Sequence, residues 1–267
     1  VYTFTTSNTD GITSYNWTNN NPAIGLEESG SGGIPSFLAT NSSNTTITAT
    51  ITVTPTYENN GISCSGLSDT FTITVNPSPQ MDSVEDIVLC NNEVSSIITF
   101  TSPNTDGATT YNWTNDNTSI GLTSSGSGDM PSFTATNPSI VPEGATITVT
   151  PTYENNGVVC VGAPQTFSIT VLSEIVVSGT PSDAVDCNDP NSGDIDLLVS
   201  GGSGSYTFLW SNGATTEDLS NVPAGDYTVD VTDTEGCTAQ SAIFTIWRQD
   251  ELTVDLVTSV DPNCEAN

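Results

Sequence analysis

One long stretch of the chain is present twice. The segment from Phe4 to Phe37 recurs without a gap from Phe100 to Phe133, an offset of 96 residues, and the same offset relates Cys64 to Cys160. This period is too long for one turn of a solenoid and has the size of a small domain. The sequence therefore predicts two copies of one folded unit, in series.

A second, shorter register follows the two repeats. Glu174–Val177 resembles Glu251–Val254, and the same offset relates Cys187 to Cys264. A different module therefore occupies the third part of the chain, and another copy of it begins before the sequence ends. The linkers between the modules are short, so we expect closely spaced units. The predicted domains are 1–78, 79–173, 174–250 and the start of a further repeat at 251–267.

The local pattern within each module is that of β-strands. Apolar and polar residues alternate along Ile47–Thr54, Phe71–Val75 and Tyr227–Val231, and many of the apolar ones are β-branched. A period of two is typical of half-buried antiparallel strands. Turn pairs such as Asn60-Gly61 separate the strands. The predicted fold class is all-β, with tandem immunoglobulin-like β-sandwich domains in an elongated array.

The charge composition excludes several classes of function. Arg248 is the one basic residue, so the chain has no lysine, and it has no histidine either. With 31 acidic residues, its net charge is −30. Schiff-base catalysis by lysine, histidine-ligated zinc and a Ser-His-Asp triad are therefore excluded. Nothing neutralises a phosphate backbone, so we expect no nucleic-acid partner. No apolar stretch is long enough to cross a bilayer, so we expect no direct membrane insertion.

The acidic residues themselves have two interpretations. Only 12% of residues are charged, so the net charge reflects missing cations more than crowded anions. We interpret the acids as part of a self-repelling extracellular surface and predict no cofactor. The alternative is calcium, which loops of aspartate and carbonyl oxygen can bind. The calcium candidates are Asp186, Asp189, Asp194 and Asp233.

The cysteines indicate disulfide bonds rather than a metal site. No Cys-x-x-Cys pair is present, and spaced cysteines in a polar chain are typical of an oxidising compartment. The repeat register predicts that Cys90 pairs with Cys160 and that Cys187 pairs with Cys237. Cys64 and Cys264 then belong to modules whose remaining parts lie outside this sequence. We accordingly expect the chain to be a segment of a longer exported protein.

The sequence contains no catalytic arrangement that we can name. Glu27 and Glu28 could form an acid pair, but the second repeat has Thr123 and Ser124 there, so a solvated loop is predicted. Aromatic residues two positions apart, such as Tyr15-x-Trp17 and its copy Tyr111-x-Trp113, share one strand face, as do Tyr206, Phe208 and Trp210. We predict that these stripes pack in the cores; a platform for stacking sugars is the alternative.

The third module resembles a known family. The residues that carry the resemblance are Val199–Tyr206, Leu209–Thr216, Pro223–Val229 and Gly236-Cys237, and the family is the SprB repeat of Bacteroidetes surface adhesins. The first two repeats resemble PKD-like domains of large Bacteroidetes surface proteins, through Tyr-Asn-Trp-Thr and Thr-Pro-Thr-Tyr.

The resemblance implies a non-catalytic protein that acts in cell adhesion. It implies a structural stalk segment of a very long adhesin used in surface attachment and gliding motility. It also implies export by the type IX secretion system to the outer-membrane cell surface. Other parts of the protein would contact a surface polysaccharide or substratum. The alternative is a polysaccharide-binding module of a secreted glycan-degrading protein. Asp82-Ser83-Val84 resembles the Bacteroidetes O-glycosylation signal, which makes Ser83 a glycosylation candidate.

Overall fold

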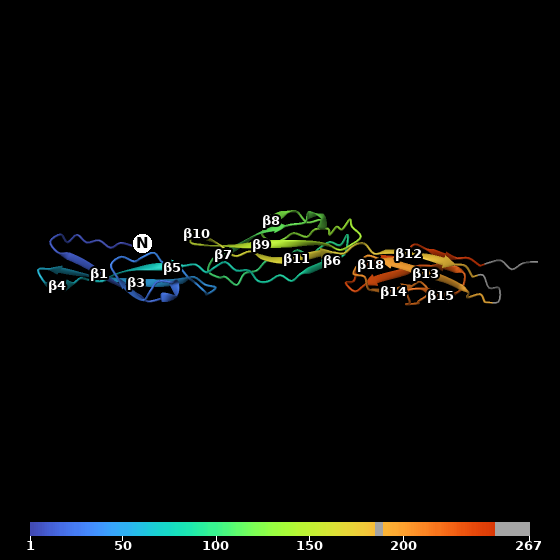
Figure 1. The fold of residues 1–267 in the computed structure, drawn as a ribbon, viewed down its shortest axis with the longest axis horizontal. Helices are drawn as coiled ribbons and strands as arrows, with labels where there is room; N and C mark the ends of the chain where they lie inside the picture. Colours follow the sequence, from blue (N-terminus) through green and yellow to red (C-terminus); the bar gives the residue numbers. More distant parts are fainter. Residues whose placement is uncertain (185–188, 249–267) are drawn as a thin grey trace, which may run out of the picture. The chain divides into compact units, whose positions relative to one another are not determined.

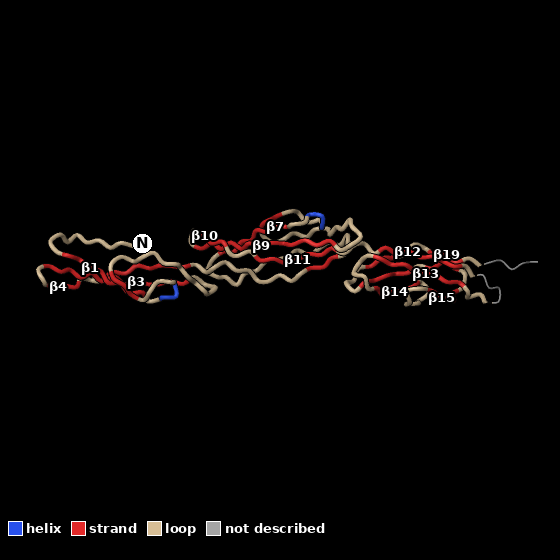
Figure 2. Tube along the Cα trace, viewed as in Figure 1, coloured by secondary structure: helices blue, strands red, loops and turns tan. Residues whose placement is uncertain are grey.

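The computed structural model describes residues 1–184 and 189–248, and their regular structure consists of strands with two short 3-10 turns (Figures 1 and 2). The predicted all-β class is confirmed. The first repeat contains β1 (Ile12–Asn19), η1 (Pro22–Ile24), β2 (Ser29–Ser31), β3 (Ile47–Asn59), β4 (Ile62–Ser65) and β5 (Asp69–Val75). The second contains β6 (Ile87–Leu89), β7 (Ala108–Asn115), η2 (Thr118–Ile120), β8 (Ser125–Ser127), β9 (Glu143–Asn155), β10 (Val158–Val161) and β11 (Gln165–Val171). The third module contains β12 (Val176–Ser182), β13 (Gly193–Ser200), β14 (Tyr206–Trp210), β15 (Leu219–Val222), β16 (Gly225–Tyr227), β17 (Val229–Asp233), β18 (Thr238–Gln240) and β19 (Phe244–Ile246).

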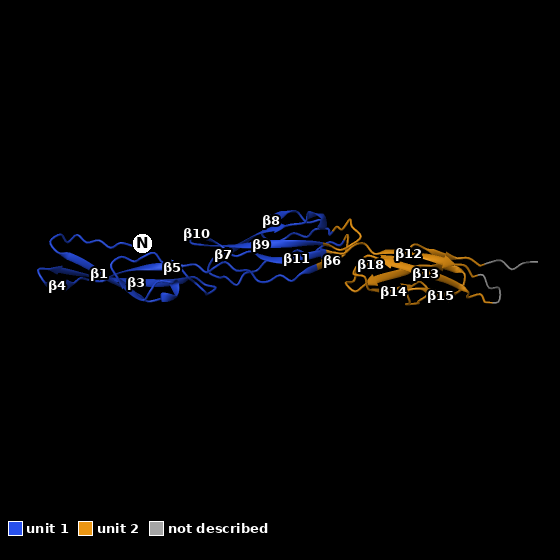
Figure 3. Ribbon diagram, in the orientation of Figure 1, with its two compact units in different colours: residues 1–87, 93–135, 144–170 blue, residues 88–92, 136–143, 171–267 orange. Residues whose placement is uncertain are grey.

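The chain divides into two compact units whose border does not follow the repeat register (Figure 3). The first unit comprises residues 1–87, 93–135 and 144–170. The second comprises residues 88–92 and 136–143 together with the chain from 171 onward. Residues 88–92, 136–143 and 171–173 of the second repeat are thus part of the same unit as the third module.

The long central strand organises the sheet of the first repeat. β3 pairs with β1 along one edge, from Ile51 to Glu58, and with β5 and β4 along the other. Its alternating sequence places Ala49, Ile51 and Val53 in the core, as the period of two predicts. The opposite layer is made of extended segments with an isolated bridge between Tyr2 and Ile34, rather than a regular second sheet.

A glycine opposite a tryptophan fixes the packing of this sheet. Trp17 of β1 is paired with Gly30 of β2, and the copies Trp113 and Gly126 are paired in the same way. A Cβ atom on Gly30 would lie 2.3 Å from the indole, and one on Gly126 would lie 2.2 Å from it. The Ser-Gly-Ser sequence therefore forms a short edge strand that leaves room for a buried ring.

The second repeat has the same topology with one additional strand. Its order is β6-β11-β9-β7-β8, with β10 also paired to β9. β6 adds to the free edge of β11. In the described part of the first repeat, no strand occupies the matching edge of β5.

Within residues 174–184 and 189–248, the strands of the third module form three small sheets. Their orders are β12-β13-β15, β14-β17-β18 and β16-β19. The core between them contains Trp210, Ile195, Val229, Val231 and Ile246, all almost fully buried.

Candidate functional site

The disulfide bond in the described residues joins Cys90 to Cys237, and both cysteines lie in the second compact unit. Their Cα atoms are 5.5 Å apart. The predicted pairs Cys90–Cys160 and Cys187–Cys237 are therefore wrong. Cys160 is a free, half-buried thiol, Cys64 is a free, exposed one, and Cys187 lies outside the described residues.

The length of β9 explains why the predicted pairing fails. Cys90 follows β6, and Leu89 accepts a hydrogen bond from Leu172, next to the end of β11. Cys160 lies on β10 opposite Tyr153, near the other end of β9. The strand from Glu143 to Tyr153 spans about 30 Å, whereas disulfide-bonded Cα atoms lie within about 7 Å. Cys90 and Cys160 therefore lie at opposite ends of the sheet, too far apart to bond, and Cys90 bonds to Cys237 of the third module instead.

Asn137 anchors the segment that carries Cys90. The Asn137 N–H donates to Asn91 Oδ1 at 2.8 Å, and its side chain Nδ2 donates to the carbonyls of Val141 and Val171 at 2.8 and 2.9 Å. Asn137 is 5% exposed, so these bonds are shielded from water. The backbone and the side chain of this one residue therefore tie three chain segments together beside the disulfide.

A tight turn between β17 and β18 carries Cys237. Asp233 Oδ1 accepts hydrogen bonds from the N–H groups of Glu235 and Cys237, at 3.0 and 2.9 Å, and Oδ2 accepts one from Ser203 at 2.8 Å. Gly236 has a φ of 88°, which favours glycine in this turn. Burial, followed by the charge of Asp233, raises the pKa of Tyr206.

Apolar packing surrounds the crosslink. Leu172 and Ile175 are buried in the core of the third module, with Cys237, and Cys90 packs against the same core. The Gly202 N–H donates to the carbonyl of Ser173 at 3.1 Å. We call this region, residues 88–92, 171–175, 201–203 and 233–237, the Cys90–Cys237 joint. It combines a covalent bond, buried apolar contacts and backbone hydrogen bonds.

The calcium candidates do not form a cluster in the described part of the chain. Asp233 is used in the turn, and Asp194 at the start of β13 accepts a hydrogen bond from the Asn221 N–H at 3.0 Å. Asp189 is exposed and accepts one from the Asn191 N–H at 2.9 Å. No three acidic or cysteine side chains among the described residues are placed to share a metal ion. Asp186 lies outside the described residues.

The tryptophans of the aromatic stripes are core residues. Trp17, Trp113 and Trp210 are 4%, 2% and 2% exposed, and Trp210 Nε1 donates to the carbonyl of Thr216 at 2.9 Å. Ring faces that are buried cannot stack on a sugar. The core-packing prediction is confirmed for these three rings, and they provide no sugar platform.

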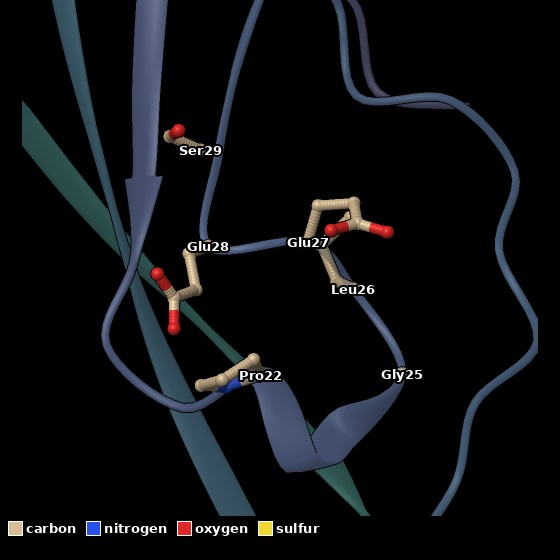
Figure 4. Close-up of a pocket in the computed structure, with 6 residues that line it drawn as sticks. All are labelled: Pro22, Gly25, Leu26, Glu27, Glu28 and Ser29. Atoms are coloured by element: carbon tan, nitrogen blue, oxygen red, sulfur yellow. The ribbon is translucent and has the colours of Figure 1, made fainter.

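Glu27 and Glu28 lie on the surface, as the loop prediction requires, beside a shallow hollow of about 530 Å³. Figure 4 shows their carboxylates pointing in different directions, that of Glu28 towards Pro22. The two groups therefore do not face one another as an acid–base pair would. Ser83 is exposed, and its glycosylation stays a prediction. No helix in the described part is long and apolar enough to cross a membrane.

Comparisons with known proteins give one family and several distant structures. Residues 179–215, in the third module, match the SprB repeat family model, and this match agrees with the resemblance of that module to the SprB repeat. No curated protein matches the chain. It is similar to a C-terminal 282-residue fragment of intimin in complex with the intimin-binding domain of its translocated receptor, at 14% identity and a TM-score of 0.34, over 74% of this chain and 57% of that chain.

Two further structures are also built from several domains. One contains extracellular domains 3–5 of Drosophila OTK, at 11% identity and a TM-score of 0.36, over 90% of this chain and 87% of that one. The other contains three N-terminal domains of the bacteriophage RB49 outer capsid protein Hoc. It has 11% identity and a TM-score of 0.39, over 91% of this chain and 89% of that one.

Proposed function

We propose that this chain is a structural stalk segment of a long cell-surface adhesin used in surface attachment and gliding motility. The match of the third module to the SprB repeat supports the adhesin class. In this proposal the protein is non-catalytic, leaves the cell by type IX secretion and stands on the outer-membrane surface of a Bacteroidetes cell. Parts of the protein outside this sequence contact the polysaccharide or substratum.

The Cys90–Cys237 joint is the observation that carries the mechanical role. A force applied to the two ends of the chain reaches Cys90 and passes through the disulfide to Cys237. The residues between the two cysteines are therefore removed from the load path while the bond is intact. This loop contains most of the second repeat and most of the third module, so neither can be pulled out as a free length of chain.

The charge distribution suits the same role. One basic residue among 31 acidic ones leaves neighbouring molecules with the same sign of charge. Their mutual repulsion disfavours aggregation, and it weakens as salt screens it. A stalk that must remain extended among many copies of itself benefits from such a surface.

Single-molecule pulling on the full chain tests the proposal. The sequence separation of 147 between the bonded cysteines corresponds to roughly 500 Å of extended chain. We expect the oxidised chain to release a contour length shorter by this amount than the reduced chain. We also expect the reduced chain to unfold its third module at lower force.

A matched control removes a cysteine that makes no bond. The Cys64→Ser variant retains the joint and should give the same traces as the parent chain. Equal released lengths and equal unfolding forces in the oxidised and reduced parent would contradict the mechanical role.

A further inference from the structure

The free thiol of Cys160 lies beside a cavity of about 730 Å³ at the end of the first repeat. The cavity is lined by Ile73 and Val75 of β5, by Asn41 and Asn76, and by Cys160 and its β10 neighbours. All of these residues belong to the first compact unit. The cavity therefore combines an unpaired strand edge, an apolar wall and a thiol.

The second repeat shows what fills this position. There β6 pairs with the edge of β11, and Ile169 and Val171 are fully buried, whereas their counterparts Ile73 and Val75 are only half-buried. The residues that follow β6 also make hydrogen bonds: the Ala135 N–H donates to Glu93 at 2.7 Å.

The matching groups of the first repeat lack these partners. Ala39, the counterpart of the fully buried Ala135, is exposed. Within the part of the chain that the structure describes, the N–H groups of Ala39 and Asn41 donate to no acceptor, whereas that of Asn137 donates to Asn91. The first repeat thus has a groove shaped for a β6-type strand and the segment that follows it.

The position of Cys160 matches that of Cys237 at the closed joint. Leu89, which precedes Cys90, accepts a hydrogen bond from Leu172, and the repeat register equates Leu172 with Asn76. Asn76 and Cys160 line the same cavity. The hairpin of β9 and β10 is held there because Asn155 Nδ2 donates to Thr46 Oγ1 at 2.9 Å. A cysteine at the end of a β6-type strand would therefore meet Cys160.

We propose that this groove binds a β6-type strand, supplied by polypeptide on the N-terminal side of Val1, and that the cysteine of this strand forms a disulfide with Cys160. In each module, the cysteine next to the first strand then forms a disulfide with a cysteine of the module that follows. Cys160 closes the joint between the first and second repeats, as Cys237 closes the next one. The proposal rests on the repeat register and the groove, and does not depend on the adhesin role.

The bond forms by thiol–disulfide exchange with an oxidised glutathione-type disulfide. One protein thiolate attacks the oxidant and releases one reduced thiol. The second protein thiolate then attacks the mixed disulfide and releases the other. Two protein thiols are oxidised to one disulfide, and their two electrons and two protons leave on two reduced thiol molecules.

Grafting tests the proposal on the full chain. A copy of residues 79–96 placed directly before Val1 continues the repeat register, and the graft is refolded in a glutathione redox buffer. We expect a disulfide between the copied cysteine and Cys160, found by peptic digestion and mass spectrometry. Pepsin is needed because the chain has one basic residue for trypsin. We also expect amide exchange in β5 to slow about tenfold or more.

Three comparisons separate strand docking from crosslinking. A graft with serine in place of its cysteine should still slow exchange in β5 but leave Cys160 open to alkylation. The Cys160→Ser variant of the graft should show the same protection with no new bond. A synthetic peptide of residues 79–96, added to the unmodified chain, should label Cys160 rather than Cys64 and provides a readout if the graft fails to fold. Alkylatable Cys160 with unchanged β5 exchange in the graft, or a bond to Cys64, would overturn the proposal.

Discussion

The first and second repeats have closely similar sequences but differently completed cores. Phe71, Ile73 and Val75 of β5 are half-buried, whereas the matching residues of β11, Phe167, Ile169 and Val171, are buried. The residue types are the same, but in the second repeat β11 is bordered by β6 and by the segment that precedes it: Gln165 Nε2 donates to the Met81 carbonyl, and the Ser168 N–H donates to Asp86 Oδ1. The apolar face of β11 is thus shielded from water in the presence of β6 and the segment that precedes it.

The two ends of the second repeat provide a related contrast. At one end Cys90 is bonded to Cys237 among buried apolar side chains; at the other, Cys160 is a free thiol beside a cavity. Each of these cysteines lies at one end of the sheet of the second repeat. The one disulfide in the described residues thus joins the second repeat to the third module and does not close either of them on itself.

The largest expected effect is loss of the closed joint. Cys90→Ser opens a loop with a sequence separation of 147 residues. We expect the free energy of unfolding of the second compact unit to fall by about 5 kcal/mol, because an unfolded chain with no crosslink has more conformational entropy. Amide exchange of peptides from β14 and β17, which belong to this unit, measured at increasing urea concentration, reports the change. Cys64→Ser is the matched control, and an equal loss in that variant would show that the effect is not due to the joint.

The next effect compares the two strand edges directly. Ile169→Ala removes a fully buried side chain, and we expect a loss of about 3 kcal/mol in the stability of the second repeat. Ile73→Ala removes the half-buried counterpart and should cost the first repeat about 1 kcal/mol. Amide exchange of peptides from β11 and β5 reports each repeat separately. Equal losses would mean that β6 does not complete the core of the second repeat.

A further pair of substitutions tests the Trp–Gly contact that the two repeats share. Gly30→Ala and Gly126→Ala each place a Cβ atom against a buried indole. Because the added methyl must displace the Trp17 or Trp113 ring, we expect each variant to lose about 2 kcal/mol. Thermal unfolding monitored by near-ultraviolet circular dichroism follows the packing of the rings. The effects should match closely between the repeats, and a loss in only one of them would show that the Trp–Gly contact is not common to both.

Much of the fold followed from the sequence because its signals are local. Alternation along residues 47–54 correctly predicted which side chains of β3 enter the core, and the shared strand face correctly placed Trp17 and Trp113 there. The repeat register also predicted that the two copies fold alike. These features depend on the period of a strand, which a short segment of sequence shows directly.

The disulfide pairing could not be predicted from the sequence, because it depends on where each cysteine lies along the length of the sheet. Alternation tells which face a cysteine occupies but not which end of a strand it is near. Cysteines left unpaired at both ends of the sequence are expected whether pairing occurs within modules or between them. One signal was present: Cys160 comes just after the turn at Asn156-Gly157, which ends a long predicted strand and places the cysteine at its far end.

The smallest expected effect concerns the hydrogen bond made by Asp86, the residue directly before β6. The Ser168 N–H donates to Asp86 Oδ1 at 2.6 Å, and this hydrogen bond lowers the pKa of Asp86. A carboxyl whose pKa is lower in the folded state adds stability above its unfolded pKa, and this stability disappears as the pH falls through the folded value. The second repeat should therefore lose protection at the β6–β11 edge below about pH 4.

Because Asp86 is fully exposed, the change should be a few-fold in the exchange rate of β11 amides, after correction for the intrinsic pH dependence of exchange. Asp86→Asn retains an acceptor oxygen but no charge, so it should weaken this edge at neutral pH and flatten its acid dependence. Glu85→Gln removes the neighbouring charge and should leave the pH profile of β11 unchanged. In the same experiment β5 of the first repeat provides the reference, since no described residue of that repeat stands in the position of Asp86. An acid-dependent loss of protection in β5 as large as that in β11 would show that the Asp86 bond does not distinguish the two edges.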